Sequence, residues 1–192
     1  MWKHRHLVAQ RVRLNAYRAV VESVLLYNCG TWALTEVLSD RLDRCQRKMM
    51  RRVLGLKWSD KVTNDDLYAR CGMSPASVQV VNARWRLFGH TLRMHECSPA
   101  RKAMAFYFIN DAPGRKGNRV TIASALSNEY KNVTNNPINT SVQYEQIVRV
   151  AQNRVAWKMV VQLVVAKYAE IHKSKVLRKT ERRLEARKKR TT

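Results

Sequence analysis

The fold of this chain is decided by the stretch TEVLSDRLDRCQRKMMRRVLG, residues 35–55. Its apolar side chains recur at steps of three and four residues, which is the spacing of one face of an α-helix. Thr35 is suited to cap the first turn, and Gly55 is suited to end the last one. We therefore predict a helix whose apolar stripe faces a core, and this stripe consists of Leu38, Leu42, Cys45, Met49 and Val53.

A row of cations follows another face of the same helix. Arg41, Arg44, Lys48 and Arg51 share a face turned away from the apolar stripe, because steps of three and four keep side chains in register. Such like charges repel by roughly 0.2 to 0.5 kcal/mol per pair. A solvated basic face and a phosphate-binding face explain this row equally well. The charge of the whole chain distinguishes these two interpretations, because 37 Lys and Arg against 14 Asp and Glu give a net charge of +23. A surplus of this size favours a polyanionic partner.

The composition limits which kinds of protein this chain can be. A chain of 192 residues that is 45% hydrophobic can bury a sizeable core. Its four cysteines are scattered singly and no secretory leader precedes them, which predicts reduced, buried thiols and an intracellular, nuclear protein. Since no run approaches the roughly 18 apolar residues of a spanning helix, we expect no membrane partner.

Helical periodicity recurs through most of the chain. We predict one helix within residues 7–27, which turns Arg11, Arg13 and Arg18 outward. A shorter helix is predicted to be capped by Asn64 and to end at Gly72. Further helices are expected after Ser74-Pro75, within 120–130, and from Thr140 or Ser141 onward. Residues 171–190 hold ten Lys or Arg and predict a frayed helix or an arm that orders on a partner; a nuclear-localisation signal and a solvated tail are alternatives.

The fold class is therefore all-α. A helical hairpin is followed by further helices and a long basic C-terminal helix or tail. The expected segments are 1–58 (hairpin), 59–110 (helical region), 111–140 (basic turn, short helix and polar loop) and 141–192 (long helix with basic tail).

A second group of cations surrounds aromatic residues in the stretch Arg84-Trp85-Arg86-Leu87-Phe88-Gly89-His90. The apolar face of this helix is predicted to be aromatic and buried, and it comprises Val78, Val81, Trp85, Phe88 and Leu92. A third group lies in Gly114-Arg115-Lys116-Gly117-Asn118-Arg119, a turn that either approaches a phosphate or is simply exposed. The candidate nucleic-acid-binding residues are Arg41, Arg44, Arg47, Lys48, Arg51, Arg52, Arg84, Arg86, His90, Arg93, Arg115, Lys116 and Arg119. Five aromatic side chains can stack on bases, but core packing is the better expectation for them, and it is weakest for Trp58. They are Trp32, Trp58, Trp85, Trp157 and Tyr27.

Signatures of catalysis are missing from the sequence. The only adjacent aspartates, Asp65 and Asp66, are interpreted as the first turn of a helix rather than as a metal site. His90, His95, Cys97 and Cys71 lack the spacing of a zinc site, and neither a phosphate loop nor a Gly-x-Ser-x-Gly motif occurs. We expect no catalytic residue, metal or cofactor in this chain.

Several blocks, taken in order, resemble the carboxy-terminal part of non-LTR (LINE-type) retrotransposon reverse transcriptases, the RTE- and jockey-like elements in particular. They are Leu26-Tyr27-x-x-Gly30-Thr31-Trp32-x-Leu34-Thr35, Arg51-Arg52-Val53-Leu54-Gly55-Leu56-x-Trp58-x-Asp60, Val62-Thr63-Asn64-Asp65-Asp66-Leu67 and Arg84-Trp85-Arg86-Leu87-Phe88-Gly89-His90. The basic turn at 114–119 looks like a degraded form of a family motif. Ala151-x-Asn153-Arg154-x-x-Trp157 is similar to a late segment of the family in which an acid is common at the place of Asn153.

This resemblance covers residues 7 to about 165 and implies that the hairpin is thumb-like. A thumb grips the template-primer duplex, so Arg44, Lys48, Arg51 and Arg52 would contact its backbone without reading sequence. The expected partners are RNA, an RNA/DNA hybrid or DNA, together with a palm/fingers polypeptide. The parent would be an RNA-directed DNA polymerase that needs Mg²⁺, and this piece, which is expected to lack the palm, should be inactive alone. The alternatives are a ribosomal-type structural RNA-binding protein and an inactive remnant of a mobile element.

Overall fold

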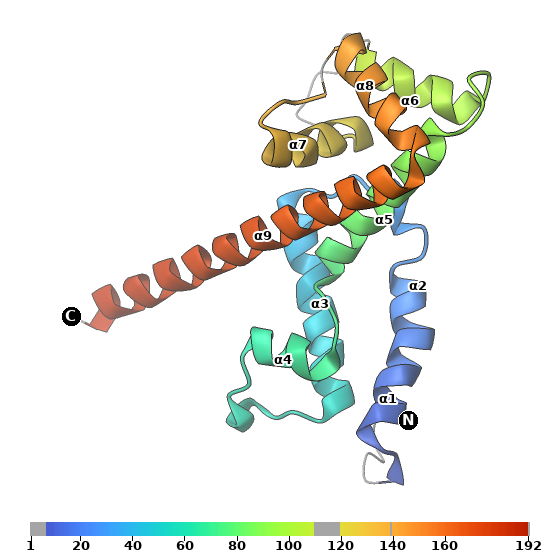
Figure 1. The fold of residues 1–192 in the computed structure, drawn as a ribbon. Helices are drawn as coiled ribbons and strands as arrows, with labels where there is room; N and C mark the ends of the chain where they lie inside the picture. The colour runs from blue at the N-terminus through green and yellow to red at the C-terminus, as the bar shows by residue number, and fades with distance from the viewer. Residues whose placement is uncertain (1–6, 110–119, 139, 192) are drawn as a thin grey trace. The chain divides into compact units, whose positions relative to one another are not determined.

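The computed structural model describes residues 7–109, 120–138 and 140–191 (Figure 1). Every regular element in these ranges is a helix, so the all-α class is confirmed. The chain divides into two compact units, Met1–Arg84 and Trp85–Thr192. This division is coarser than the four segments expected from the sequence, whose boundaries remain predictions.

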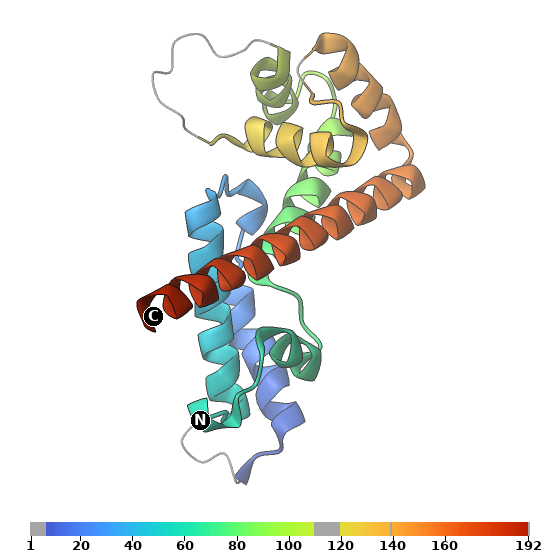
Figure 2. The same cartoon turned by 90° about the vertical axis from the view of Figure 1, so that its left-hand side faces the viewer.

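The first unit holds the N-terminal helices and the basic helix. Its elements are α1 (Gln10–Ala16), the π-helical η2 (Tyr17–Glu22), α2 (Ser23–Leu25), the 3-10 turn η3 (Cys29–Thr31), α3 (Glu36–Leu54), the 3-10 turn η4 (Trp58–Asp60), α4 (Asn64–Cys71) and the beginning of α5 (Ala76–Leu92). α1 and α3 lie side by side in both views (Figures 1 and 2). The predicted helices of this part are therefore present, with the first one extending over residues 10–25.

The ends of α3 and α4 follow the predicted chemistry. The Thr35 hydroxyl accepts a hydrogen bond from the Leu38 amide at 3.3 Å, and Gly55 ends α3 in the left-handed conformation at φ 77°. Gly72 ends α4 in the same way at φ 57°. The cap of α4 differs by one residue from the sequence expectation, because Thr63 rather than Asn64 accepts from the Asp66 amide at 3.2 Å.

The buried face of α3 is not the predicted apolar stripe. The residues that α3 buries are Ser39, Asp43, Gln46, Met50 and Val53. Of the stripe, only Val53 belongs to this face; Leu38 is 44% exposed, Cys45 is exposed, and Leu42 and Met49 are half-buried. The expectation was wrong because the first half of the buried face is polar. The spacing of apolar residues in the sequence therefore does not identify this face.

Two polar side chains of this face cap the start of α5. Asp43 accepts from the Ser77 amide at 2.9 Å and from the Ser77 hydroxyl at 2.8 Å. Gln46 accepts from the Ala76 amide at 2.8 Å. The first amides of a helix have no partner within it, so α3 satisfies two donors that would otherwise be buried and unpaired. The same Gln46 donates to Glu22 at 3.1 Å, which connects η2 to the network.

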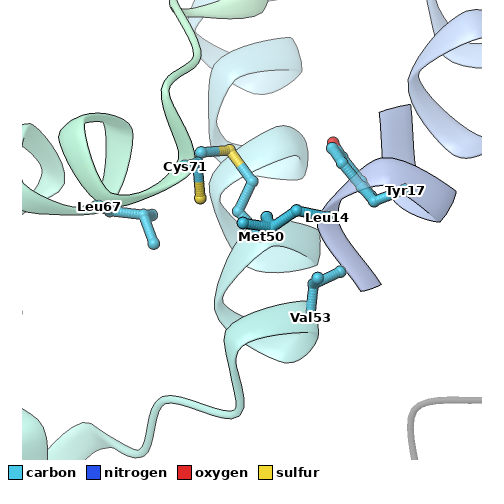
Figure 3. Packing of buried hydrophobic residues seen from close by; sticks show 6 residues of the cluster. All are labelled: Leu14, Tyr17, Met50, Val53, Leu67 and Cys71. Carbon is cyan, nitrogen blue, oxygen red and sulfur yellow. The ribbon is translucent and has the colours of Figure 1, made fainter. Parts of the chain in front are cut away.

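A compact apolar cluster closes the first unit. Leu14 and Tyr17 come from the N-terminal helices, Met50 and Val53 from α3, and Leu67 and Cys71 from α4 (Figure 3). Figure 3 shows these six side chains converging between the three segments. The cluster holds α3 against both of its neighbours.

Two arginines of the N-terminal helices bind the ends of other helices. Arg13 was expected to face solvent, but it is buried and donates to the Val53 carbonyl in the last turn of α3. Arg18 is exposed, as expected, yet it donates to the Cys71 carbonyl and, at 3.1 Å, to the Gly72 carbonyl at the end of α4. A guanidinium is suited to these places because the last carbonyls of a helix lack amide partners and carry partial negative charge.

The second unit contains an aromatic core. It holds the end of α5, α6 (Pro99–Ile109), α7 (Ile122–Thr134), α8 (Ser141–Gln152) and α9 (Arg154–Thr191). The prediction for α5 is confirmed, because Val78, Val81, Trp85, Phe88 and Leu92 are all buried along the helix. Trp85 donates to Glu129 at 2.7 Å, and Trp157 donates to the Trp85 carbonyl at 3.2 Å. Trp157 lies so close to Gly89 that a Cβ there would be 2.0 Å from the indole nitrogen.

The helix expected from Thr140 onward is divided in two at Asn153. Its start is confirmed, because the Thr140 hydroxyl accepts from the Gln143 amide at 3.3 Å. Asn153 has ψ 107°, which is not helical, and its side chain accepts from the Val155 and Ala156 amides at 2.9 and 3.2 Å. A capping role explains why an acid or asparagine suits this position. The basic segment 171–190 continues as part of α9. None of the helices described is long and apolar enough to cross a membrane.

The cap that α3 gives to α5 predicts a stability effect. Asp43→Ala leaves the Ser77 amide and hydroxyl buried without this acceptor, and we expect it to lower the free energy of unfolding by about 3 kcal/mol. Urea unfolding followed by circular dichroism measures this change. Glu145→Ala removes an exposed acid from α8 and should cost less than about 0.5 kcal/mol. Equal stability of Asp43→Ala and the wild type would contradict the capping role.

Candidate functional site

The cations of α3 and those of the following loop surround one hollow in the first unit. The hollow has a volume of about 720 Å³. Its lining residues are Arg44, Arg47, Lys48, Arg51, Leu56, Lys57, Trp58, Lys61 and Val62. Six of these nine carry a positive charge and none is acidic. We call this the basic hollow.

The end of α3 creates the hollow by reversing the chain. Gly55 adopts φ 77°, and the amides of Gly55 and Leu56 both donate to the Arg51 carbonyl, at 2.9 and 3.0 Å. The chain then returns along α3, and the Arg51 guanidinium fastens it there. Arg51 donates to the Val62 carbonyl at 3.3 Å and to the Asn64 side chain at 2.9 Å. Arg51 therefore holds the two walls of the hollow together as well as lining it.

Arg47 is oriented by a neutral partner. Its guanidinium lies 3.5 Å from the Tyr68 hydroxyl, which donates to the Gln46 side chain at 3.3 Å. Burial raises the pKa of Tyr68 to about 12, an effect that Arg47 opposes. The hydroxyl therefore stays protonated at neutral pH. It positions Arg47 without cancelling its charge.

Trp58 stands on a short, fixed turn at the edge of the hollow. Its side chain is 99% exposed. The turn η4 is closed by the Asp60 carboxylate, which accepts from the Lys57 amide at 2.7 Å, and by the Asp60 amide, which donates to the Lys57 carbonyl at 3.2 Å. Lys61 follows at φ 45°, in the left-handed region that side chains other than Asn, Asp and Gly rarely adopt. The loop thus places an indole and two ammonium groups beside the basic face of α3.

Four of the residues predicted from the sequence line the hollow. Arg44, Arg47, Lys48 and Arg51 line the hollow, whereas Arg41 and Arg52 are exposed elsewhere on α3. The remaining predicted residues fall into three groups. Arg84 and Arg93 donate to backbone carbonyls, of Trp32 at 2.7 Å and of Ala151 at 3.1 Å; Arg86 and His90 are exposed on α5; and Arg115, Lys116 and Arg119 lie outside the described residues.

Arg84 is buried, with 4% of its surface exposed, so in this structure it does not reach a ligand on the surface. Five lining residues were not predicted as site residues: the aliphatic Leu56 and Val62, and the chemically distinctive Lys57, Trp58 and Lys61. Their position depends on the chain reversal after Gly55. The signal in the sequence was the glycine at the end of the helix, followed by an isolated tryptophan between lysines.

The acidic pair and the cysteines have structural surroundings. Asp66 accepts from the Thr63 hydroxyl at 2.7 Å at the start of α4, so the interpretation of Asp65 and Asp66 as a first helical turn is confirmed. All four cysteines are free. Cys29 and Cys71 are buried, and burial raises the pKa of both thiols, but Cys45 and Cys97 are exposed, contrary to the expectation of burial. Among the described residues, no three His, Cys, Asp or Glu side chains are grouped to hold a metal ion.

Comparison of this chain with models of protein families, with curated proteins and with solved structures finds no match. The chemistry of the site is therefore argued from its residues. A hollow with six cations, an exposed indole and no acidic lining residue can bind an extended anion and stack on a planar ring.

The left-handed backbone of Lys61 predicts that a residue better suited to this region would stabilise the chain. Asn adopts the left-handed region more readily than Lys. We expect Lys61→Asn to raise the free energy of unfolding by about 0.5 kcal/mol, within the roughly 1 kcal/mol that this region costs other residues. Lys57→Asn is the matched control, since Lys57 has extended backbone (φ −97°, ψ 163°) and loses the same charge. Thermal unfolding measures both variants, and a gain in Lys57→Asn as large as that in Lys61→Asn would contradict the assignment.

Proposed function

We propose that this chain binds nucleic acid, RNA or an RNA/DNA hybrid, through phosphate contacts at the basic hollow. The observation that carries the proposal is the convergence of six cations from two segments on one hollow whose lining contains no acidic residue. Phosphates gain from such a site because Lys and Arg that neutralise them release condensed counter-ions. The net charge of +23 adds long-range attraction for the same class of ligand.

The extent of the charged surface favours a strand over a small anion. From Arg44 to Arg51, α3 advances by about 10 Å at 1.5 Å per residue. A row of this length can contact more than one phosphate of a strand. Lys57 and Lys61 extend the charge to the opposite wall. A single phosphate would use only part of this set.

Together with the family resemblance, the proposal names a parent protein and a ligand. The chain would be a C-terminal piece of a retrotransposon reverse transcriptase that binds the sugar-phosphate backbone of the template-primer and has no polymerase active site of its own. Arg44, Lys48 and Arg51, which the resemblance assigned to the duplex backbone, line the hollow, whereas Arg52 does not. Phosphate contacts position a duplex but do not read its bases. Binding should therefore tolerate changes of sequence, whereas a ribosomal-type protein would prefer one folded RNA.

The proposal predicts that affinity for nucleic acid falls steeply as the salt concentration rises, and that the cations lining the hollow account for the binding. If about six phosphates are neutralised, affinity for a primed RNA/DNA hybrid should fall by roughly three decades between 50 and 200 mM salt. The triple variant Arg44→Glu, Lys48→Glu and Lys57→Glu changes exposed lining residues and leaves Arg51, which fastens the loop, in place. We expect it to weaken binding at least 100-fold at 100 mM salt, measured by fluorescence anisotropy.

A second triple variant controls for net charge. Lys102→Glu, Arg149→Glu and Lys158→Glu change the net charge by the same amount at exposed positions of the second unit. We expect this variant to bind within about threefold of the wild type at the same 100 mM salt, where the Debye length is about 10 Å. Equal losses in the two variants would assign binding to diffuse charge, and a flat salt response of the wild type would reject phosphate binding altogether.

A further inference from the structure

We propose that the basic hollow receives an unpaired nucleotide, whose base stacks on Trp58 and whose neighbouring phosphates contact the lysines and arginines around it. This inference rests on the proposed function and specifies its ligand as a single-stranded segment. It is carried by the position of one indole, which phosphate binding alone does not require.

The exposure of Trp58 has no explanation in the packing of the chain. The indole is 99% exposed, whereas Trp85 and Trp157 are buried in the second unit at 0% and 5% exposure. Leu56 and Val62, on either side of the turn, do pack against the core of the first unit. The loop is therefore anchored by its aliphatic residues and leaves its largest apolar side chain in solvent.

The turn that carries the indole is closed by hydrogen bonds of its own residues. The two hydrogen bonds between Lys57 and Asp60 close the turn directly beneath Trp58, at 2.7 and 3.2 Å. Arg51 fastens the end of the loop through the Val62 carbonyl and Asn64. An indole has only two side-chain torsions, so it loses little conformational entropy when a planar ligand stacks on it.

The lining around Trp58 matches the chemistry of a single strand. Lys57 precedes the indole and Lys61 follows it by three residues, while Arg44 and Lys48 line the hollow from α3. Proteins that bind single strands combine a positively charged groove for the backbone with aromatic rings for the bases. A base inside a duplex is stacked on both faces and paired along one edge, so it offers no free face to an indole. In a primed template, the unpaired bases next to the duplex end would provide such a face.

The test compares three probes with one variant pair. The probes are a 12-nucleotide single-stranded RNA, a blunt 12-base-pair RNA/DNA hybrid and a 12-unit abasic sugar-phosphate strand. Trp58→Ala removes the ring, and Trp58→Phe is the matched variant that keeps a stacking surface. Since Trp58 is exposed, thermal unfolding of both variants should coincide with that of the wild type.

We expect Trp58→Ala to weaken binding of the single-stranded RNA about 5- to 150-fold, the range that stacking of one base accounts for. Binding of the hybrid and of the abasic strand should change less than about twofold, and Trp58→Phe should keep affinity for the single strand within about fivefold of the wild type. The slope of affinity against salt should stay the same, because the indole carries no charge.

The possible failures are distinguishable. If Trp58→Ala binds all three probes as tightly as the wild type, or loses affinity for all three equally, the stacking inference is wrong while phosphate binding stands. If the wild type binds none of the probes at 50 mM salt, the proposed function is wrong, and the stacking inference is wrong with it.

Discussion

The cap that α3 provides for α5 sets the rotation of the basic helix. Asp43 and Gln46 satisfy the first amides of α5 from the side, so their face of α3 must point inward. Once this rotation is fixed, Arg44 and Lys48 point to solvent, and Arg47 comes to lie at the Tyr68 hydroxyl. A buried polar contact therefore decides which side of the first unit carries the charge. The apolar cluster beside this contact stabilises the same rotation of α3.

The positive charge of the chain serves two purposes. One set of arginines is used inside the structure, where Arg13, Arg84 and Arg93 donate to backbone carbonyls of neighbouring segments. Arginine suits this role because its planar group carries five donors and keeps its charge. The second set surrounds the basic hollow, and under the proposed function this set contacts the phosphates. The net charge of +23 thus overstates the number of cations that a ligand would meet.

The sequence predicted the helices and their ends better than it predicted their faces. Gly55 and Thr35 act through local backbone chemistry, which a sequence carries directly. The rotation of α3 was missed because Asp43 looks like a solvent residue until its partner Ser77, 34 residues away, is known. Three cations of the site, Arg44, Lys48 and Arg51, were found as part of a helical row, and Arg47 was predicted as a binding residue outside that row. Trp58 was left open because its exposure depends on how the loop after Gly55 returns along α3, which no local pattern encodes.

The most direct measurement of the central claim is the position of bound nucleic acid on the chain. Single-stranded RNA containing 4-thiouridine, cross-linked by light to the full chain at 100 mM salt and analysed by mass spectrometry, reports which residues the bases touch. If the basic hollow is the binding site, the adducts will fall on residues 56–62 and the outer face of α3, with Trp58 prominent among them. Adducts confined to the second unit, with residues 36–62 unmodified, would contradict the account.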